Sequence, residues 1–496
     1  MTRLTLLFLT FLLSGCGDDI NYVDDPLKKD QWYINDSTNS QSHINLNNMR
    51  YKGRGVLVSL LDTGIDIDHE DLIHNIGEGN YSYLPKEYDF NDADHGTACA
   101  GIIAAEEGNG LGGSGVAPQA KIIGFNALKA PALSNLADAL IRKKENVWVS
   151  NNSWGDFNSW GEPLALRSLI RTALEDGVRD GRHGKGTVYV FSAGNGASVE
   201  NSLPTDNVNY SGLVNNRFVI PVCAVDEHGM RASYSEIGAT LIVCAPSQGD
   251  DENSPGISTT DVMGKKGYNP VLFPNDYANF NYTKNFSGTS ASAPIVSGIV
   301  ALMLEANPNL GWRDVRAILA KSARVTDEKH TDWTENGAGL KVNHHYGFGL
   351  VNADQAITVA EKWVNYSDEI VLEKEAFVQL EIPDNDATGI ISEINVEENL
   401  SIEFTDIFFD APDHTRLGDL EIILVSPSGT RSILSEHHKE LFDGVFRYKN
   451  WRFGSMRHLE ESARGTWKLI IRDKAESETG VFRSWSLKIY GHDAIK

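Results

Sequence analysis

NFSGTSASAPIVSG, residues 285–298, runs from small and hydroxyl-bearing residues into an apolar helix. Ser and Thr commonly stand at helix starts, because a side-chain oxygen can accept a hydrogen bond from a free backbone N–H. A serine at a helix N-terminus can also serve as a nucleophile, since the helix dipole there favours negative charge. Ser290 is therefore either a cap or an attacking group, and the surrounding chain has to distinguish the two.

Apolar runs alternate with helical patterns from about residue 55 to 320. Helical segments such as HGTACAGIIAAEE and GWRDVRAILAKSA lie between continuous apolar runs, which are expected of parallel strands buried on both faces. This alternation predicts an α/β domain whose parallel sheet has helices on both faces. The apolar runs are GVLVSLLD, AKIIGF, NVWVSNNS, TVYVFSAGN, FVIPVCAV and LIVCAP.

The pattern changes after about residue 365. A chain of 496 residues is too long for one ordinary core, so a second domain is expected. Strands with alternating polarity, separated by turn residues, predict an all-β sandwich or barrel. The polar stretch EKWVNYSDE, residues 361–369, is the predicted linker. The strand-like segments are DLEIILVSPSGTRSIL, GTWKLIIRD and SWSLKIYG.

The chain is acidic, with 68 Asp and Glu against 44 Lys and Arg and a formal net charge of −24. This argues against nucleic acid as a partner, because such binding needs a basic face that displaces counterions. The charge suits calcium or cationic peptides, although excess carboxylate also serves solubility alone.

The N-terminus is predicted to be a targeting segment. Arg3 precedes the apolar run LTLLFLTFLL, which is too short to span a bilayer as a stable helix. The following LSGC resembles the lipobox of bacterial lipoproteins, which implies a signal peptide 1–15, a lipid on Cys16 and a tether 16–24. An ordinary secretory signal is the alternative. Because Gly17 rather than Asp follows, we expect an outer membrane lipoprotein of the bacterial envelope, or a secreted protein.

Three cysteines remain besides Cys16. Cys99 lies four residues after His95, on the same face of a helix, and is interpreted as a small buried hydrophobe. Cys223 and Cys244 lie in strand-like runs, so in an exported protein they can pair or stay reduced.

Suitable catalytic side chains follow the predicted strands. Asp62 ends VSLLDTG, Asn195 ends YVFSAGNG, and His95 opens the helix of DHGTACAG. In an open parallel sheet, reactive groups gather beyond the carboxyl ends of strands. A serine hydrolase needs a hydroxyl nucleophile, an imidazole, a carboxylate and an oxyanion donor. Each residue alone has another interpretation. Asp62 could cap a turn, His95 could be a hydrogen-bonded core histidine, and Asn195 could sit in a left-handed turn.

Four segments in chain order, LLDTGID, HGTACAG, SAGNG and GTSASAP, resemble the signatures of subtilisin-like serine proteases. The resemblance implies that Ser290 is the nucleophile, His95 its base, Asp62 the carboxylate that orients the base and Asn195 the oxyanion donor. A lipase or esterase would instead have a G-x-S-x-G elbow, which is not the context of Ser290. The other alternative is a surface lipoprotein whose catalytic fold is inactive.

The second domain resembles the P domain of kexin- and furin-like proprotein convertases, through GDLEIILVSPSGTRSIL, GTWKLIIRD and SWSLKIYG. In that family the P domain is a β jelly roll that packs on the catalytic domain and stabilises it. The resemblance implies a catalytic domain over 25–360, a linker over 361–369 and a P domain over 370–496. We therefore expect a calcium-dependent serine endopeptidase that acts on proteins or peptides as a monomer.

The Gly-rich stretch AAEEGNGLGGSG is predicted to bind Ca²⁺, which prefers several hard oxygen ligands. Its G-x-G-x-x-G is weak evidence for a dinucleotide because it follows a helix and not a strand. The resemblance to convertases implies a first site of three side chains and three carbonyls: Asp25, Asp71 and Asn109, with Glu106, Leu111 and Gly113. A second site maps onto Asn158, Asn201 and Glu236, with amides for two carboxylates. A third would use Asp89, Asp92 and Asp94, which could equally form a solvated acidic loop.

The same resemblance predicts the substrate cleft. SNNSWG should pair with substrate backbone, and Asp206 falls on a pocket-base carboxylate that accepts a basic side chain. The second acidic partner of that pocket is Asn158 here, or Asp156 if the loop alignment slips. The predicted wall residues are Ser153, Trp154 and Gly155 on one side and Ala193 and Gly194 on the other.

Two departures predict how specificity differs from the convertases. Thr63 replaces the acidic residue that helps recognise a second basic side chain, and residues 127–135 lack further carboxylates. Lys129 in that stretch would repel a third basic side chain. We therefore expect cleavage after a single Lys or Arg, with only a weak preference for a preceding basic residue.

The segment between Cys16 and Asp25 is too short for the prosegment that usually templates folding in these families. Unless an upstream start supplies one, the sequence predicts folding unaided but helped by calcium, or folding with a separate chaperone protein.

Overall fold

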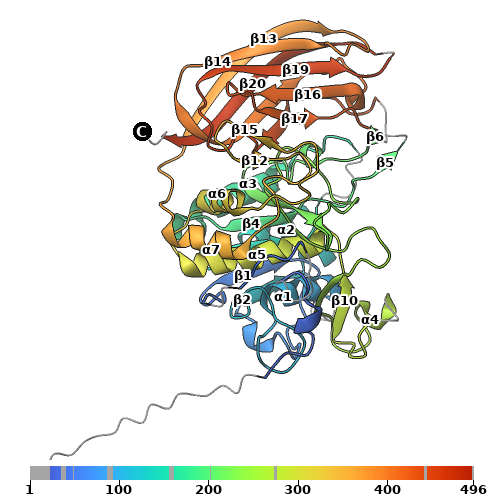
Figure 1. The fold of residues 1–496 in the computed structure, drawn as a ribbon, viewed down its shortest axis with the longest axis vertical. Helices are drawn as coiled ribbons and strands as arrows, with labels where there is room; N and C mark the ends of the chain where they lie inside the picture. The colour runs from blue at the N-terminus through green and yellow to red at the C-terminus, as the bar shows by residue number, and fades with distance from the viewer. Residues whose placement is uncertain are drawn as a thin grey trace, which may run out of the picture.

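The computed structural model describes residues 23–34, 41–47, 50–85, 93–155, 161–200, 203–272, 276–440, 444–476 and 478–493. The lipidation prediction at Cys16 and the predicted ligands Asp89, Asp92, Asn158 and Asn201 lie outside these residues, as does Asp156. Figure 1 shows two stacked domains, with a mixed α/β domain below an all-β domain.

The lower domain is built on a six-stranded sheet of order β2-β1-β3-β4-β7-β8, in which every pairing is parallel. The strands are apolar and almost wholly buried, as expected when helices cover both faces of a sheet. Their bounds are β1 Leu57–Leu61, β2 Lys121–Phe125, β3 Val149–Asn152, β4 Val188–Ser192, β7 Val219–Val225 and β8 Val243–Pro246.

Helices cover both faces of this sheet, so the predicted fold class is confirmed. Alternate strand residues feed two separate cores: Val58 and Leu60 pack with one set of helices, and Leu61 packs with the other. The first set is α1 Asp94–Ala104, α5 Thr289–Ala306, α6 Trp312–Ser322 and α7 Ala353–Lys362, and the second is α2 Leu133–Ile141 and α3 Ser168–Gly184.

Helix α5 is the element that begins with the quoted stretch. Among the described residues it is the one helix long and apolar enough to cross a bilayer, but most of it is buried between the sheet and α1 and α7. The shorter elements of the domain are η1 Lys28–Asp30, η3 Ile73–Asn75, η5 Ala127–Lys129, β5 Val199–Glu200, β6 Leu203–Pro204, η6 Val208–Tyr210, β9 Ile257–Thr260, α4 Tyr268–Val271, β10 Tyr282–Phe286, β11 Thr334–Glu335 and β12 Lys341–Val342.

The upper domain consists of two four-stranded antiparallel sheets, of order β13-β20-β15-β18 and β14-β19-β16-β17. Their inner faces enclose an aromatic core that includes Trp467, Trp485 and Phe409. The bounds are β13 Ile370–Ile382, β14 Ile390–Val396, β15 Leu400–Asp410, η7 Leu417–Asp419, β16 Leu420–Val425, β17 Arg431–Ser435, β18 Trp451–Ser455, β19 Gly465–Asp473 and β20 Gly480–Asp493.

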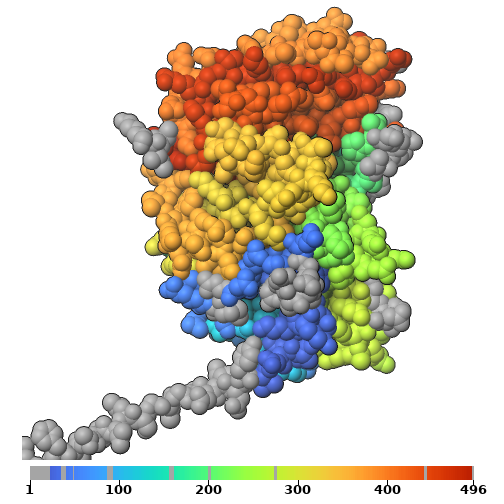
Figure 2. Space-filling model, in the orientation of Figure 1, coloured from blue at the N-terminus to red at the C-terminus, as the bar shows by residue number. Residues whose placement is uncertain are grey.

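The two domains pack directly on each other, and Figure 2 shows no gap between the orange and red upper domain and the domain below it. The predicted linker is itself held in place, because Trp363 Nε1 and Tyr366 N both donate to Asp314 Oδ1 at 2.9 Å. Across the interface, Arg313 Nε donates to Glu403 Oε2 at 2.7 Å. The second domain is therefore a fixed part of the molecule.

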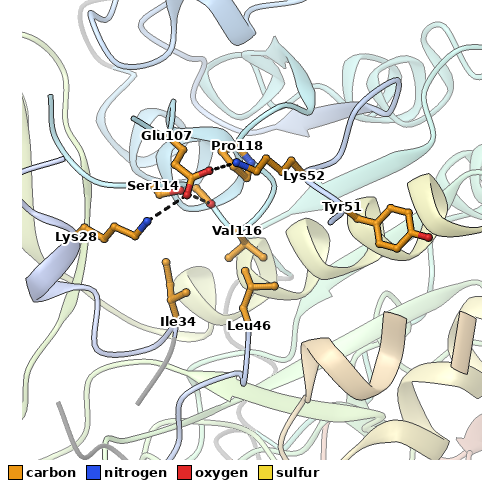
Figure 3. Close-up of a pocket in the computed structure, with 10 residues that line it drawn as sticks. Lys28, Ile34, Leu46, Tyr51, Lys52, Glu107, Ser114, Val116 and Pro118 are labelled. Atoms are coloured by element: carbon orange, nitrogen blue, oxygen red, sulfur yellow. Dashed lines mark hydrogen bonds and ion pairs between the residues drawn. The ribbon is translucent and has the colours of Figure 1, made fainter. Parts of the chain in front are cut away.

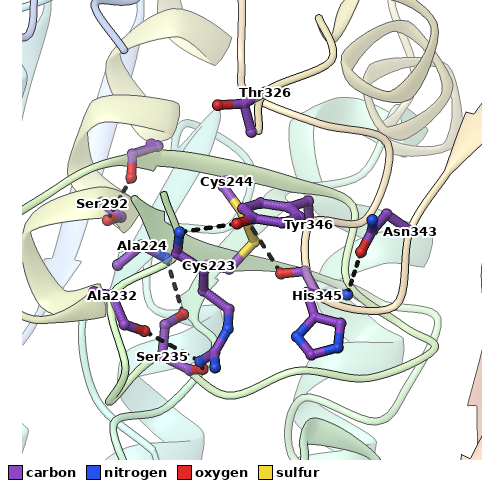
Figure 4. Close-up of a disulfide and its surroundings, with 12 residues drawn as sticks. Cys223, Ala224, Ala232, Ser235, Cys244, Ser292, Thr326, Asn343, His345 and Tyr346 are labelled. Carbon is purple, nitrogen blue, oxygen red and sulfur yellow. Dashed lines mark hydrogen bonds between the residues drawn. A yellow bond between two sulfur atoms is a disulfide. The ribbon is translucent and has the colours of Figure 1, made fainter. Parts of the chain in front are cut away.

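Cys223 and Cys244 form a disulfide between the neighbouring strands β7 and β8, which settles the alternative that the sequence left open. Figure 4 shows the bond between the strands, with Tyr346 beside it and the neighbouring residue His345 further away. The bond closes a sequence separation of 21 residues. Cys99 is a free, buried thiol, as the sequence predicts.

Candidate active site

The side chains predicted to act together lie at one edge of the sheet. Asp62 directly follows β1, and Asn195 lies three residues beyond the end of β4. His95 is the second residue of α1 and Ser290 the second residue of α5. Parallel strands bring their carboxyl ends to one edge, so residues far apart in the sequence meet there.

Asp62 and His95 form a close pair. His95 Nδ1 lies 2.8 Å from Asp62 Oδ1 and 3.0 Å from Asp62 Oδ2, and Asp62 is fully buried. The carboxylate also accepts a hydrogen bond from Thr63 N at 2.6 Å. A carboxylate facing Nδ1 holds the proton there, which leaves Nε2 as the basic atom of the ring. A Cβ on Gly96 would lie 1.9 Å from the Gly64 carbonyl oxygen, so only glycine fits beside the pair.

Two opposing effects determine the pKa of His95. Burial lowers the pKa of the imidazole, while the negative charge of Asp62 and its hydrogen bond raise it, and the net result lies well above the usual value. The ring also packs edge-on against Phe286, with centroids 5.4 Å apart. The site therefore stabilises an imidazolium, the species that forms when a histidine accepts a proton.

Ser290 sits in the first turn of α5, where backbone N–H groups lack partners within the helix. Its Oγ donates to the Ser153 carbonyl at 3.3 Å, and Ser153 Oγ donates in return to the Ser290 carbonyl at 3.0 Å. Gly288 precedes the helix with φ 80°, and a Cβ there would lie 3.2 Å from Asn195 Nδ2. A glycine is needed at this position for both reasons.

The amide of Asn195 is oriented by the start of α5. Asn195 Oδ1 accepts hydrogen bonds from Thr289 N and from Thr289 Oγ1, each at 2.9 Å. Because these bonds occupy the oxygen, the amide nitrogen is the atom left to donate to a substrate. Ser290 and Asn195 line the same cleft as His95.

This cleft has a volume of about 760 Å³, and most of the predicted substrate-binding residues line it: Ser153, Trp154, Gly155, Gly194 and Asp206. The prediction for Ala193 is wrong in one respect. Its side chain is buried in the core against α2 and α3, because it continues the alternation of β4, and Ser192 and Gly194 line the cleft instead. Thr63 and Lys129 also line the cleft, and neither contributes a carboxylate to it.

Glu236 is a cleft residue that the pocket prediction did not include. A Cβ on Gly196 would lie 2.7 Å from Asp206 Oδ2 and 3.2 Å from Glu236 Oε1, so the two carboxylates flank this glycine. Both side chains are buried. The sequence offered Glu236 only as a calcium ligand, and its companions in that prediction lie outside the described residues. Asp94, proposed for a third site, accepts a hydrogen bond from His95 N at 2.9 Å.

The predicted first calcium site is a compact loop around Asp71. Asp25 accepts hydrogen bonds from the N–H groups of Gly108, Asn109 and Gly110, at 2.8, 3.1 and 3.1 Å. Asn109 Nδ2 donates to Asp71 Oδ1 at 2.8 Å, while Asp71 Oδ2 is buried without a hydrogen-bond partner. Burial raises the pKa of Asp71 to about 8. A buried orphan carboxylate oxygen among oxygen-bearing side chains fits a cation.

The loop that bears the predicted carbonyl ligands Glu106, Leu111 and Gly113 wraps closely around this carboxylate. A Cβ on Gly112 would lie 2.2 Å from Asp71 Oδ2. Glu107 anchors the loop by ion pairs to Lys28, at 3.1 Å, and to Lys52, at 2.5 Å. Figure 3 shows Glu107 between the two lysines, above a small hollow of about 60 Å³ lined by Ile34, Leu46 and Val116. The N-terminal segment is thus fastened to the loop.

The fold and the side chains in the cleft are those of serine hydrolases with the chain order Asp, His, Ser. The comparisons with known proteins narrow this class. A family model described as the subtilase family matches residues 53–349, and one described as the proprotein convertase P-domain matches residues 411–489. The chain belongs to the subtilase family, a family of serine endopeptidases.

Curated relatives agree with this assignment. The proprotein convertase subtilisin/kexin type 4 of Mus musculus is 32% identical over 498 residues, which cover 94% of this chain and 70% of the relative. The dibasic-processing endoprotease of Schizosaccharomyces pombe is 32% identical over 95% of this chain and 66% of its own length. Against the type 5 convertase of Rattus norvegicus, also 32% identical, the chain spans only 26% of the relative.

Solved structures show the same two-domain fold. The serine protease of Aeromonas sobria is 27% identical, with a TM-score of 0.84 over 97% of this chain and 99% of that one. A structure of that protease with its chaperone gives a TM-score of 0.85 at 27% identity, over 95% of this chain and 96% of that one. The similarity therefore extends across both domains.

Proposed function

We propose that this protein is a calcium-dependent serine endopeptidase that cleaves protein or peptide substrates after Lys or Arg. The observation that carries the proposal is the pairing of His95 with the buried Asp62 in the cleft that Ser290 and Asn195 also line. Labelling by a serine-directed fluorophosphonate tests it.

The proposed reaction is acyl transfer in two steps. Ser290 Oγ attacks the scissile carbonyl carbon while His95 Nε2 takes the hydroxyl proton. Asn195 Nδ2 and the free Ser290 N–H donate to the resulting oxyanion. When the tetrahedral intermediate collapses, the leaving amine takes the proton from His95 and an acyl-serine remains. Water, deprotonated by His95, then attacks the ester, releases the carboxylic acid and restores Ser290.

The proposed preference for Lys or Arg rests on two buried carboxylates at one end of the cleft, Asp206 and Glu236. A basic side chain seated between them would form charge-assisted hydrogen bonds. The relative from Schizosaccharomyces pombe is described as dibasic-processing. In this chain Thr63 and Lys129 line the cleft where further acidic residues would be needed, so we propose that one basic residue suffices.

The activity should depend on pH through His95. The base is active when neutral, and its pKa is raised, so kcat/KM should fall as the pH drops through a value above 6.5. Asp62→Asn should lower kcat by about 10⁴-fold and move this inflection to lower pH, because the carboxylate that raises the pKa of the ring is then lost. A pH profile of kcat/KM for both proteins measures the shift. An inflection unchanged in Asp62→Asn would contradict the assigned pair.

We propose that Asp25, Asp71 and Asn109, with the loop carbonyls of Glu106, Leu111 and Gly113, hold one Ca²⁺. The ion would neutralise the buried carboxylates and tie the N-terminal segment to the loop. Chelation should therefore lower the unfolding temperature, because an ion that binds only the folded state stabilises it. Asp71→Asn should abolish the response to EDTA, whereas Glu335→Gln, on a surface strand, should retain it. A wild-type melting curve that neither EDTA nor added Ca²⁺ shifts would contradict the site.

We also propose export to the bacterial envelope with a lipid on Cys16, or secretion, on the strength of the lipobox-like LSGC. Mass spectrometry of the mature N-terminus distinguishes the acylated from the free form. A separate chaperone is the proposed folding partner, supported by the structure of the Aeromonas sobria protease with a chaperone. Active enzyme obtained on expression alone would remove the need for one.

A further inference from the structure

A loop of the P domain reaches the part of the catalytic domain that carries Asp206. This loop, residues 436–440, follows β17, and Figure 1 shows β17 above the β5–β6 hairpin side of the catalytic domain. Lys439 N donates to the Pro204 carbonyl at 2.8 Å, and Asn207 Nδ2 donates to Glu436 Oε1 at 3.2 Å. The residues on either side of the Asp206 segment are thus hydrogen bonded to the P domain.

His438 is the centre of this contact. Its ring stacks on Tyr210 with centroids 4.5 Å apart and an interplanar angle of 27°. Its Nδ1 lies 3.1 Å from Tyr210 Oη, and its Nε2 lies 2.8 Å from the Gly161 carbonyl oxygen. The side chain is only 3% exposed. Because Tyr210 and Gly161 belong to different segments, His438 fastens those two segments to each other.

Gly161 is packed tightly between the 436–440 loop and the chain at Thr205. A Cβ there would lie 2.6 Å from His438 Cδ2, 2.6 Å from the Lys439 carbonyl oxygen and 2.8 Å from the Thr205 carbonyl oxygen. Its φ of 79° also requires glycine. Gly161 follows the wall residues Ser153–Gly155 in the chain, and Thr205 precedes Asp206. The loop therefore contacts the chain at Gly161 and on both sides of Asp206, at Pro204 and Asn207.

Docking of the P domain does not depend on this loop alone. Arg313 and Glu403 join the domains near α6, which Figure 1 places on the opposite side of the interface from β5 and β6. Asn215 adds a further contact, since Gly454 N donates to its Oδ1 at 2.6 Å. The contact of loop 436–440 with the segment that carries Asp206 is thus an addition to the interface.

We propose that His438 and Glu436 of the P domain are positioning residues for substrate, which hold Asp206 in place for the basic side chain. The inference rests on the proposed function, because it assigns that side chain to Asp206. A misplacement of a binding group by about 1 Å, caused far from the reacting atoms, can cost up to about a hundredfold in rate. The effect should appear in KM, since the loop touches none of the reacting residues.

The test compares His438→Ala with His438→Gln, whose side-chain amide can still donate to the Gly161 carbonyl. With a peptide substrate that has Arg before the scissile bond, His438→Ala should raise KM about tenfold and change kcat less than about threefold. His438→Gln should recover most of the loss. Glu436→Gln, which keeps an amide oxygen for Asn207 and His344 but removes the charge, and Glu436→Ala, which removes the acceptor of both, give independent variants if His438→Ala does not fold.

Glu403→Gln is the matched control, because it weakens the interface on the side away from the cleft. It should lower the unfolding temperature and leave KM unchanged. The proposal is overturned if His438→Ala and Glu436→Ala lower the unfolding temperature as Glu403→Gln does and leave KM unaltered. A wild-type enzyme that prefers neutral residues would overturn the proposed substrate class instead. The effect of His438→Ala on KM for the peptide that the wild type prefers would then test the positioning role.

Discussion

Ser290→Ala is expected to lower kcat by about 10⁴- to 10⁶-fold while the fold remains intact. The Ser290 hydroxyl donates one long hydrogen bond, of 3.3 Å, to the Ser153 carbonyl, so its removal costs the fold little. The residual rate would come from substrate binding and oxyanion stabilisation. Steady-state kinetics on a peptide substrate, with melting curves of both proteins, measure the effect.

Asn195→Ala should lower kcat less than Ser290→Ala does. Loss of one oxyanion donor should lower kcat by about 10²- to 10³-fold with little change in KM. The structure gives the reason, since Thr289 holds the Asn195 amide oxygen and leaves its nitrogen toward the cleft. Peptidase activity retained in purified Ser290→Ala would contradict the assignment of Ser290 as the nucleophile. An unchanged kcat in Asn195→Ala would contradict only the assignment of Asn195 as an oxyanion donor.

Asp206→Asn should change the specificity of the enzyme. For a peptide with Arg or Lys before the scissile bond, kcat/KM should fall by about 10²-fold or more, because the cation then loses a buried carboxylate partner. Glu236 remains in the pocket, so the double variant Asp206→Asn, Glu236→Gln should lose more than either single variant. Peptides with a neutral residue at this position should be cleaved as well as before.

The control for this experiment is Asp180→Asn, a surface carboxylate of α3 that pairs with Lys144 outside the cleft. It should leave the substrate profile unchanged. A library profile dominated by aromatic or aliphatic residues, and identical in wild type and Asp206→Asn, would show that another pocket determines specificity.

The fold could be predicted because each strand of the parallel sheet is a nearly continuous apolar run, as burial on both faces requires. The approximate location of Asp62, Asn195, His95 and Ser290 followed from the same reasoning, since they all lie at strand ends or helix starts. Pairing of Cys223 with Cys244 could not be predicted, because it depends on β7 and β8 being neighbours in the sheet.

The positions of Glu236 and His438 could not be predicted from the sequence. Glu236 enters the pocket beside Gly194 and Gly196 because these glycines leave space for its side chain, and nothing in its local sequence indicates this. His438 lies more than two hundred residues from Tyr210 in the chain. Contacts between domains depend on how two finished folds pack, and periodicity within either domain carries no information about them.

The most direct test of the account is to locate the nucleophile chemically. The purified full-length protein is treated with a fluorophosphonate and digested, and the modified residue is identified by mass spectrometry. We expect one modified peptide, labelled at Ser290, and a large loss of labelling in His95→Ala. Modification of a different serine, or an active peptidase that the reagent neither labels nor inhibits, would contradict it.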